Sequence, residues 1–169
     1  MTVIEMNPTS LSPQQLGLLM QYTVEAYKTF EKLAESLPNP MAAAMFANFA
    51  VEERLHRDLL EGKIATSSVA RIKVTLGPDL LFQDILEGDL SYREMTEFLI
   101  AREKTMQRRL EEIRKTSPQS DLYMLIYLTA AKRAHIVELE RELELIRLDP
   151  DWFRREDAEF RIANGPRPA

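Results

Sequence analysis

Residues 46–60 read FANFAVEERLHRDLL, and this stretch decides how the rest of the chain is interpreted. On an α-helix, residues three apart lie on one face, so Glu53 and His56 point to the same side. A carboxylate and an imidazole that converge in this way make half of a metal site. The sequence holds two histidines, and the second is His135.

The segment around His135 repeats the segment around His56 at an offset of 79 residues. The pairs related by this offset include Met45 and Met124, Phe46 and Leu125, Phe49 and Leu128, Arg54 and Arg133, and Leu60 and Leu139. Upstream the offset is 80, as in Leu19 and Leu99, Phe30 and Leu110, and Pro38 and Pro118. A connecting loop that differs by one residue explains the change of offset, so the sequence predicts a duplicated helical hairpin.

Composition narrows the class of protein. A length of 169 residues, 45% apolar residues and only five glycines favour a single all-α globular domain. The net charge of −5 argues against a nucleic-acid partner. The absence of cysteine excludes disulfides, Fe–S clusters, cysteine zinc sites and thiol catalysis. With no basic leader and no long apolar run, the sequence predicts a soluble cytoplasmic protein without a membrane segment.

The first half reads as an arm at 1–11 and a helical hairpin at 12–62. Ser12 and Gln15 form a capping box around Pro13, which predicts a helix from Ser12 to about Leu37. Asn39-Pro40 begins a second helix that runs to about Gly62. The predicted inward positions are Leu16, Leu19, Thr23, Ala26, Phe30, Leu33, Leu37, Met45, Phe46, Phe49, Ala50, Glu53, His56 and Leu60.

Residues 63–90 read as a long crossover, with an extended piece at 71–76 and a short helix at 80–86. A crossover of this length lets a second hairpin return to the end of the bundle where the first began. Long crossovers can also exchange between subunits, so we expect a homodimer.

The second hairpin is predicted at 91–147. Ser91 and Glu94 form another capping box and begin a helix that runs to about Lys115, and a last helix runs from about Pro118 or Asp121 to Arg147. The predicted inward positions are Phe98, Leu99, Glu103, Met106, Leu110, Ile113, Met124, Leu125, Leu128, Lys132, His135, Leu139, Leu143 and Ile146. The charged runs at 102–104 and 138–144 are otherwise expected to face solvent. Residues 148–169 form an extension whose Trp152, Phe153, Phe160 and Ile162 are available for packing.

The chain resembles the rubrerythrin branch of the ferritin-like superfamily. The resemblance rests on four predicted helices, a two-fold repeat, the Glu53-x-x-His56 motif and the run DLSYREMTEFLIAREK at 89–104. The resemblance covers Ser12 to about Leu145. It implies an antiparallel four-helix bundle in which a Glu from helices 1 and 3 and a Glu-x-x-His from helices 2 and 4 hold two irons. It also implies oxidase or peroxidase chemistry, by a non-haem iron oxidoreductase with a diiron centre.

Carried over residue by residue, the resemblance assigns Glu53, His56, Glu103 and His135 as metal ligands. Two family positions differ. Lys132 stands where helix 4 should carry a glutamate, and Thr23 stands where helix 1 should carry one, while the nearby Glu25 is turned outward.

Three readings follow. In the first, the four remaining ligands hold one divalent ion, such as iron, manganese or zinc, and Lys132 bends toward solvent or pairs with Glu138. In the second, Lys132 replaces the metal as a counter-ion for Glu53 and Glu103, and the protein serves in binding or assembly. In the third, both histidines are ordinary core residues. The sequence names neither a substrate nor an electron donor.

Overall fold

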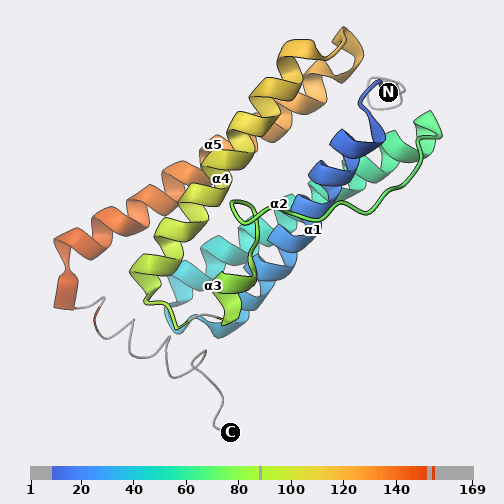
Figure 1. The fold of residues 1–169 in the computed structure, drawn as a ribbon. Coiled ribbons are helices and arrows are strands. Elements are labelled where there is room, and N and C mark those ends of the chain that lie inside the picture. Colours follow the sequence, from blue (N-terminus) through green and yellow to red (C-terminus); the bar gives the residue numbers. More distant parts are fainter. Residues whose placement is uncertain (1–8, 88, 152–153, 155–169) are drawn as a thin grey trace, which may run out of the picture.

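The structure is a computed structural model of the chain, and it describes residues 9–87, 89–151 and 154. The described residues contain no strand, which confirms the all-α prediction. In chain order the helices are α1 (Pro13–Ser36), α2 (Pro40–Ser67), α3 (Gln83–Glu87), α4 (Tyr92–Thr116) and α5 (Gln119–Leu148). As Figure 1 shows, α1 and α2 form one hairpin, α4 and α5 form a second, and the two hairpins lie alongside each other.

The predicted starts of the long helices are confirmed, and those of α1, α2 and α4 are encoded by a local side-chain cap. The Ser12 hydroxyl accepts from Gln15 N and the Gln15 side chain accepts from Ser12 N, and Ser91 and Glu94 repeat this capping box. Asn39 caps α2 by accepting from the backbone of Met41 and Ala42.

The predicted end of α2 at Gly62 is wrong, because the helix continues to Ser67. Gly62 lies on the exposed side, where a missing side chain costs only about 1 kcal/mol. Leu60 and Ile64 are both buried and continue the apolar stripe past the glycine. The helix ends where Ser68 takes a left-handed conformation with φ 54°.

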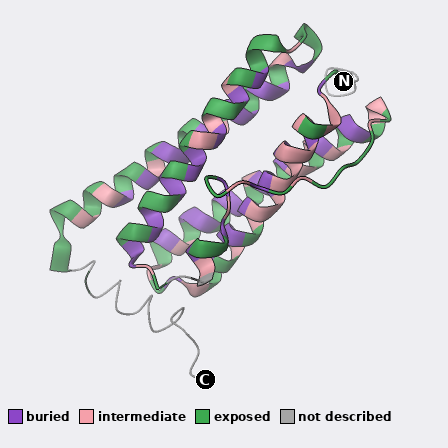
Figure 2. Cartoon of the chain, viewed as in Figure 1, coloured by how far each residue is buried: buried purple, intermediate pink, exposed green. Residues whose placement is uncertain are grey.

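The core lies between the helix faces that point toward one another, as Figure 2 shows. Its aromatic centre is formed by Phe30, Phe46 and Phe49, whose ring centroids are 5.4 to 6.0 Å apart. Nearly all predicted inward positions are buried. Phe98 is an exception: its side chain is 39% exposed and packs beneath the Arg102 guanidinium, so the prediction that it faces inward is wrong. Leu143 and Ile146 are only partly buried, because they lie near the end of α5.

The crossover runs along the α1–α2 hairpin and returns the chain to the start of α4 (Figure 1). Residues 71–76 form no strand, and the short helix begins at Gln83 rather than at residue 80. The Phe82 ring packs on Tyr22 at 5.2 Å between centroids. Arg102 is buried and donates from Nε to the Leu81 carbonyl at 2.7 Å, so the prediction that this arginine faces solvent is wrong.

At Gly17 of α1 the crossover passes close to the helix. A Cβ at this position would lie 2.7 Å from the Cγ2 atom of Val74 and 3.0 Å from the Ile72 carbonyl oxygen. Only a glycine therefore lets the crossover lie directly on α1.

Of the N-terminal arm, residues 9–11 are described. Thr9 N donates to the Ser67 hydroxyl, and Ser10 donates to Asp121 from both its backbone and its side chain. These contacts fasten the arm to the end of α2 and to the first turn of α5. The aromatic residues predicted to pack from the C-terminal extension, Trp152, Phe153 and Phe160, lie outside the described residues, as does Ile162.

Candidate functional site

All four long helices send a polar side chain to one point inside the protein. Tyr22 comes from α1, Glu53 from α2, Glu103 from α4, and Lys132 and His135 from α5. All five side chains are buried, and the most exposed of them, Lys132, is only 3% accessible. Polar groups buried so deeply must satisfy one another, and we call these five residues the central cluster.

Lys132 lies between the two carboxylates of the central cluster. Its Nζ forms a short ion pair with Glu53 Oε1 and lies 3.4 Å from Glu103 Oε2. The same Nζ lies 5.1 Å from the centroid of the Tyr22 ring, over its face. Burial alone would lower the pKa of Lys132, but the charges of Glu103 and Glu53 outweigh it and raise this pKa. Lys132 is therefore a buried ammonium.

His135 is held at both ring nitrogens by carboxylates. Its Nδ1 lies 2.7 Å from Glu103 Oε1, and its Nε2 lies 2.7 Å from Glu52 Oε2. The ring packs on Phe49, with centroids 4.0 Å apart. Burial would lower the pKa of His135, but the two hydrogen bonds raise it to about 9. At neutral pH both nitrogens carry protons and the side chain is an imidazolium.

The two carboxylates of the central cluster remain ionised because cations surround them. Burial would raise the pKa of Glu53, but Lys132, together with both histidines, lowers it to about 2. For Glu103 the charge of Lys132 and the hydrogen bond from His135 likewise outweigh burial and lower the pKa. Two carboxylates, one ammonium and one imidazolium give a net charge of zero, which is the condition for burying so many charges together.

Tyr22 gives the buried Glu103 carboxylate a further hydrogen bond. Its hydroxyl donates to Glu103 Oε2 at 2.6 Å. Burial, followed by the charge of Glu103, raises the pKa of Tyr22 well above its ordinary value of 10. The tyrosine is therefore a neutral donor that holds the Glu103 carboxylate in a single orientation.

His56 is buried, as predicted, but it contacts Glu53 from outside the group formed by Glu53, Glu103 and His135. Its Nδ1 lies 3.3 Å from Glu53 Oε2, the oxygen that does not pair with Lys132. Its ring packs edge-on against Tyr127 at 5.4 Å. His56 therefore supports the far side of Glu53, while His135 lies on the Lys132 side.

The residues of the central cluster fit the metal centre that the resemblance implies only in part. One donor atom each from Glu53, Glu103 and His135 lie within 4.8 Å of one another, which suits a single ion. A two-metal centre does not fit, because position 23 is a buried threonine, and Lys132, which stands where the resemblance implies a glutamate, brings a positive charge to Glu53. Glu25 cannot replace Thr23, because it accepts a hydrogen bond from Gln21 on the outer side of α1.

Glu52 is a functional candidate that the sequence analysis missed. Its side chain is 47% exposed, and it is the one partner of His135 that reaches solvent. In metal sites a carboxylate commonly holds the second nitrogen of a ligating histidine in this way. The sequence feature that could have indicated Glu52 is its position next to Glu53. When Glu53 points inward, the side chain of Glu52 points sideways toward α5.

A second buried polar pair was also missed, because the run at 138–144 was expected to face solvent. Glu142 is buried and accepts from the Tyr92 hydroxyl at 2.7 Å. This contact fastens the start of α4 to the end of α5 and is separate from the central cluster.

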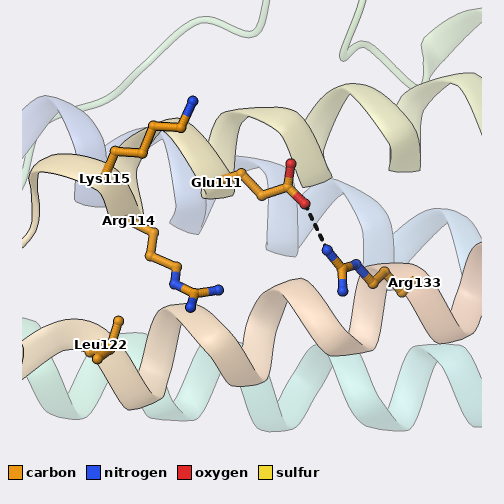
Figure 3. A pocket seen from close by; sticks show the side chains of 5 residues that line it. All are labelled: Glu111, Arg114, Lys115, Leu122 and Arg133. Atoms are coloured by element: carbon orange, nitrogen blue, oxygen red, sulfur yellow. Dashed lines mark hydrogen bonds and ion pairs between the residues drawn. The ribbon is translucent and has the colours of Figure 1, made fainter.

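The structure also has a surface pocket of about 370 Å³ between the end of α4 and the start of α5. Figure 3 shows its lining, in which Arg133 pairs with Glu111 at 3.0 Å beside Arg114 and Lys115. Its cations are exposed and none belongs to the central cluster, so we do not place the functional site there.

Comparison of the chain with protein-family models, with curated protein sequences and with solved structures found no match. Within the described residues, none of the helices combines the length and the apolar character needed to cross a membrane. The geometry of the central cluster is therefore the feature of this protein that points to a function.

Proposed function

We propose that the protein is a ferritin-like helical bundle that binds one divalent metal ion, such as iron, manganese or zinc, in exchange for the Lys132 ammonium. Glu53, Glu103 and His135 would hold the ion. The observation that carries the proposal is the convergence of their three donor atoms within 4.8 Å, from three different helices.

Charge balance supports this exchange. With a metal bound, the charges of two glutamates, a neutral His135 and a divalent ion sum to zero. Without it, the charges of two glutamates, the His135 imidazolium and the Lys132 ammonium also sum to zero. The ion therefore enters without leaving net charge in the core, provided that His135 loses its proton and Lys132 withdraws or also loses a proton. If Lys132 stayed charged about 5 to 8 Å from the ion, repulsion would cost roughly 4 to 7 kcal/mol.

The surrounding residues would prepare the donors for the ion. Glu52 accepts from Nε2 of His135 and so directs Nδ1 inward, and the Tyr22 hydroxyl fixes Glu103. A bound iron would supply the oxygen or peroxide redox chemistry of the family that the chain resembles. We do not extend the proposal to two-metal catalysis, because the residues at positions 23 and 132 do not fit it.

The second candidate function is a metal-free protein with a binding or assembly role. The contact of Lys132 with both Glu53 and Glu103 favours it, because the cluster is already neutral and satisfied without an ion. In this case Lys132 is a permanent counter-ion that holds the two hairpins together.

Metal analysis of the wild type and of Lys132→Glu separates the two candidates. Both proteins are loaded with ferrous, manganous or zinc ion under anaerobic conditions, desalted and measured by elemental analysis. If the protein binds a metal, we expect close to one equivalent of metal per chain in the wild type. We expect tighter metal binding in Lys132→Glu, because the variant replaces a cation with a ligand. Lys104→Glu is the matched control, since Lys104 is an exposed lysine of α4 and should leave metal content unchanged.

A wild type without metal together with a variant that binds it would establish Lys132 as the permanent counter-ion. If neither protein retains metal, the metal-binding proposal is wrong. Thermal unfolding with and without chelator provides a second readout, because an ion that binds only the folded state raises its melting temperature.

A further inference from the structure

The central cluster is connected to solvent through Glu52. Among the residues that the structure describes, two from outside the cluster bond to it, Glu52 and His56. The His56 side chain is 1% exposed, whereas the Glu52 side chain is 47% exposed. Glu52 reaches the cluster through Oε2, which lies 2.7 Å from Nε2 of His135, and its Oε1 bonds to no described residue. One carboxylate therefore joins water to the buried site.

The crossover closes the side of the central cluster where α1 and α4 meet (Figure 1). The Phe82 side chain is 2% exposed, and its ring packs on Tyr22 with 5.2 Å between centroids. The Leu81 carbonyl accepts from Nε of Arg102, which is buried on α4 one residue before Glu103. A metal ion on this path would meet an apolar ring and a buried positive charge, and both oppose its passage.

A surface pocket of about 380 Å³ lies on this closed side and offers the competing route. Its lining includes Glu25, Lys32 and Phe82, so the Phe82 ring lies between the pocket and Tyr22. Glu25 accepts a hydrogen bond from Gln21 and, in the described part of the chain, does not bond to the central cluster. The pocket thus presents a carboxylate to solvent without a contact that leads inward.

We propose that Glu52 is the entry residue of the protein, through which a divalent metal ion reaches the central cluster between α2 and α5. This inference rests on the proposed function, and it concerns the path of the ion rather than its final ligands. Oε1 of Glu52 takes the ion from water, and Oε2 releases Nε2 of His135 as the carboxylate turns. Glu53 and Glu103 then receive the ion beside Nδ1 of His135. Because carboxylate oxygens replace part of the water shell before the ion enters the core, the cost of removing that water is lowered.

Glu52→Gln separates entry of the ion from the positioning of His135. The glutamine amide oxygen can still accept a hydrogen bond from Nε2, so the orientation of the imidazole is kept, but the negative charge at the surface is lost. Loss of this charge should slow the uptake of a divalent ion roughly 10-fold. A residue that only positioned His135 would leave the uptake rate unchanged and alter the release rate.

Stopped-flow transfer of Zn²⁺ from a chromophoric indicator to the full chain measures the uptake rate. Wild type and Glu52→Gln should both take up close to one equivalent of zinc, and the variant should do so roughly 10-fold more slowly. Added salt should slow uptake by the wild type more than uptake by the variant, because salt screens the attraction of a surface charge. Circular dichroism should show that both proteins are folded.

Glu25→Gln is the matched control, because it removes a carboxylate from the competing pocket. Its uptake rate should equal that of the wild type. The comparison is then repeated with Lys132→Glu present in each protein, where tighter metal binding is expected. Because Lys132 lies inside the cluster, Glu52→Gln should slow uptake by the same factor in this background.

Two outcomes would overturn the inference without touching the proposed function. One is uptake that is slowed by Glu25→Gln and not by Glu52→Gln, which would place entry at the crossover. The other is equal uptake rates in the wild type and Glu52→Gln with one equivalent of zinc bound in each. If neither the wild type nor Lys132→Glu takes up zinc, the entry residue and the metal-binding proposal are both wrong.

Discussion

Lys132 and His135 are two cations on consecutive turns of α5, and both are buried among carboxylates. A charge in such surroundings is stable only while its partners keep theirs, so each residue depends on the protonation of the others. Stability should therefore depend on pH at both ends of the range in which these groups titrate.

Above neutral pH we expect the protein to lose stability through His135. Its pKa is raised from 6.5 to about 9, so its contribution is fully present below about pH 6.5 and is lost as the pH rises through 9. The shift corresponds to roughly 3 kcal/mol of unfolding free energy. Urea unfolding measured between pH 6 and pH 10 checks this. In His135→Gln the decline attributed to this residue should disappear, and an unchanged decline would contradict the assignment.

In acid we expect the protein to lose stability through Glu53, whose pKa is lowered where that of His135 is raised. The pKa of Glu53 is lowered from 4.5 to about 2, so its contribution is present above about pH 4.5 and is lost as the pH falls through 2. We expect the unfolding free energy to decline steeply over this interval. Glu61→Gln is the control, because Glu61 lies on the same helix but pairs with Arg71 at the surface. In this variant the decline in acid should persist. A wild type whose stability is flat down to pH 2 would show that Glu53 is not held ionised.

At the scale of the elements, the hairpins are encoded locally and the crossover is encoded by its contacts. The capping boxes at Ser12 and Ser91 act within one helical turn. Three contacts fix the position of the crossover: Phe82 packs in the core, Arg102 binds the Leu81 carbonyl, and Gly17 leaves room for the crossover on α1. These contacts involve residues far apart in the sequence.

Gly17→Ala should destabilise the protein, although alanine is the better helix former. The new Cβ would meet Val74 and the Ile72 carbonyl, and overpacking of this kind typically costs about 1–3 kcal/mol. Gly62→Ala is the matched control, because nothing lies within 4 Å of its added Cβ, and it should gain up to about 1 kcal/mol. Thermal and urea unfolding of both variants measures the difference. Equal effects would mean that the crossover does not rest on α1.

At the scale of the whole molecule, the central cluster joins the two hairpins. Tyr22 and Glu53 come from the first hairpin, and Glu103, Lys132 and His135 come from the second. Neither hairpin alone neutralises its own buried charges. The hairpins should therefore unfold together, as one cooperative unit.

Hydrogen exchange measured by mass spectrometry tests this cooperativity. Amides at 46–56 and 125–136 surround the central cluster within helices, and we expect them to exchange slowest and at similar rates. Residues 69–75 are at least partly exposed and lie outside any helix, so their amides should exchange much faster. Slow exchange confined to one hairpin would show that the hairpins are independent units.

The sequence alone was sufficient where a local pattern or the apolar period decides the outcome. It predicted the all-α class, the starts of the four long helices and the burial of Glu53, His56, Glu103 and His135. It was wrong at Phe98, Gly62 and Arg102. Arg102 is buried because it binds the Leu81 carbonyl, which is distant in the sequence, and α2 continues past Gly62 because the buried Ile64 extends its apolar stripe.

What the sequence by itself determined is that Glu53, Glu103, Lys132 and His135 point inward, because helical periodicity fixes which side chains share a face. What only the tertiary structure decided is which groups touch: Lys132 lies between Glu53 and Glu103, Glu52 holds His135, and His56 contacts the Glu53 oxygen that does not pair with Lys132. The physical reason is that a buried charge takes its partner from a helix whose position depends on the packing of the whole core.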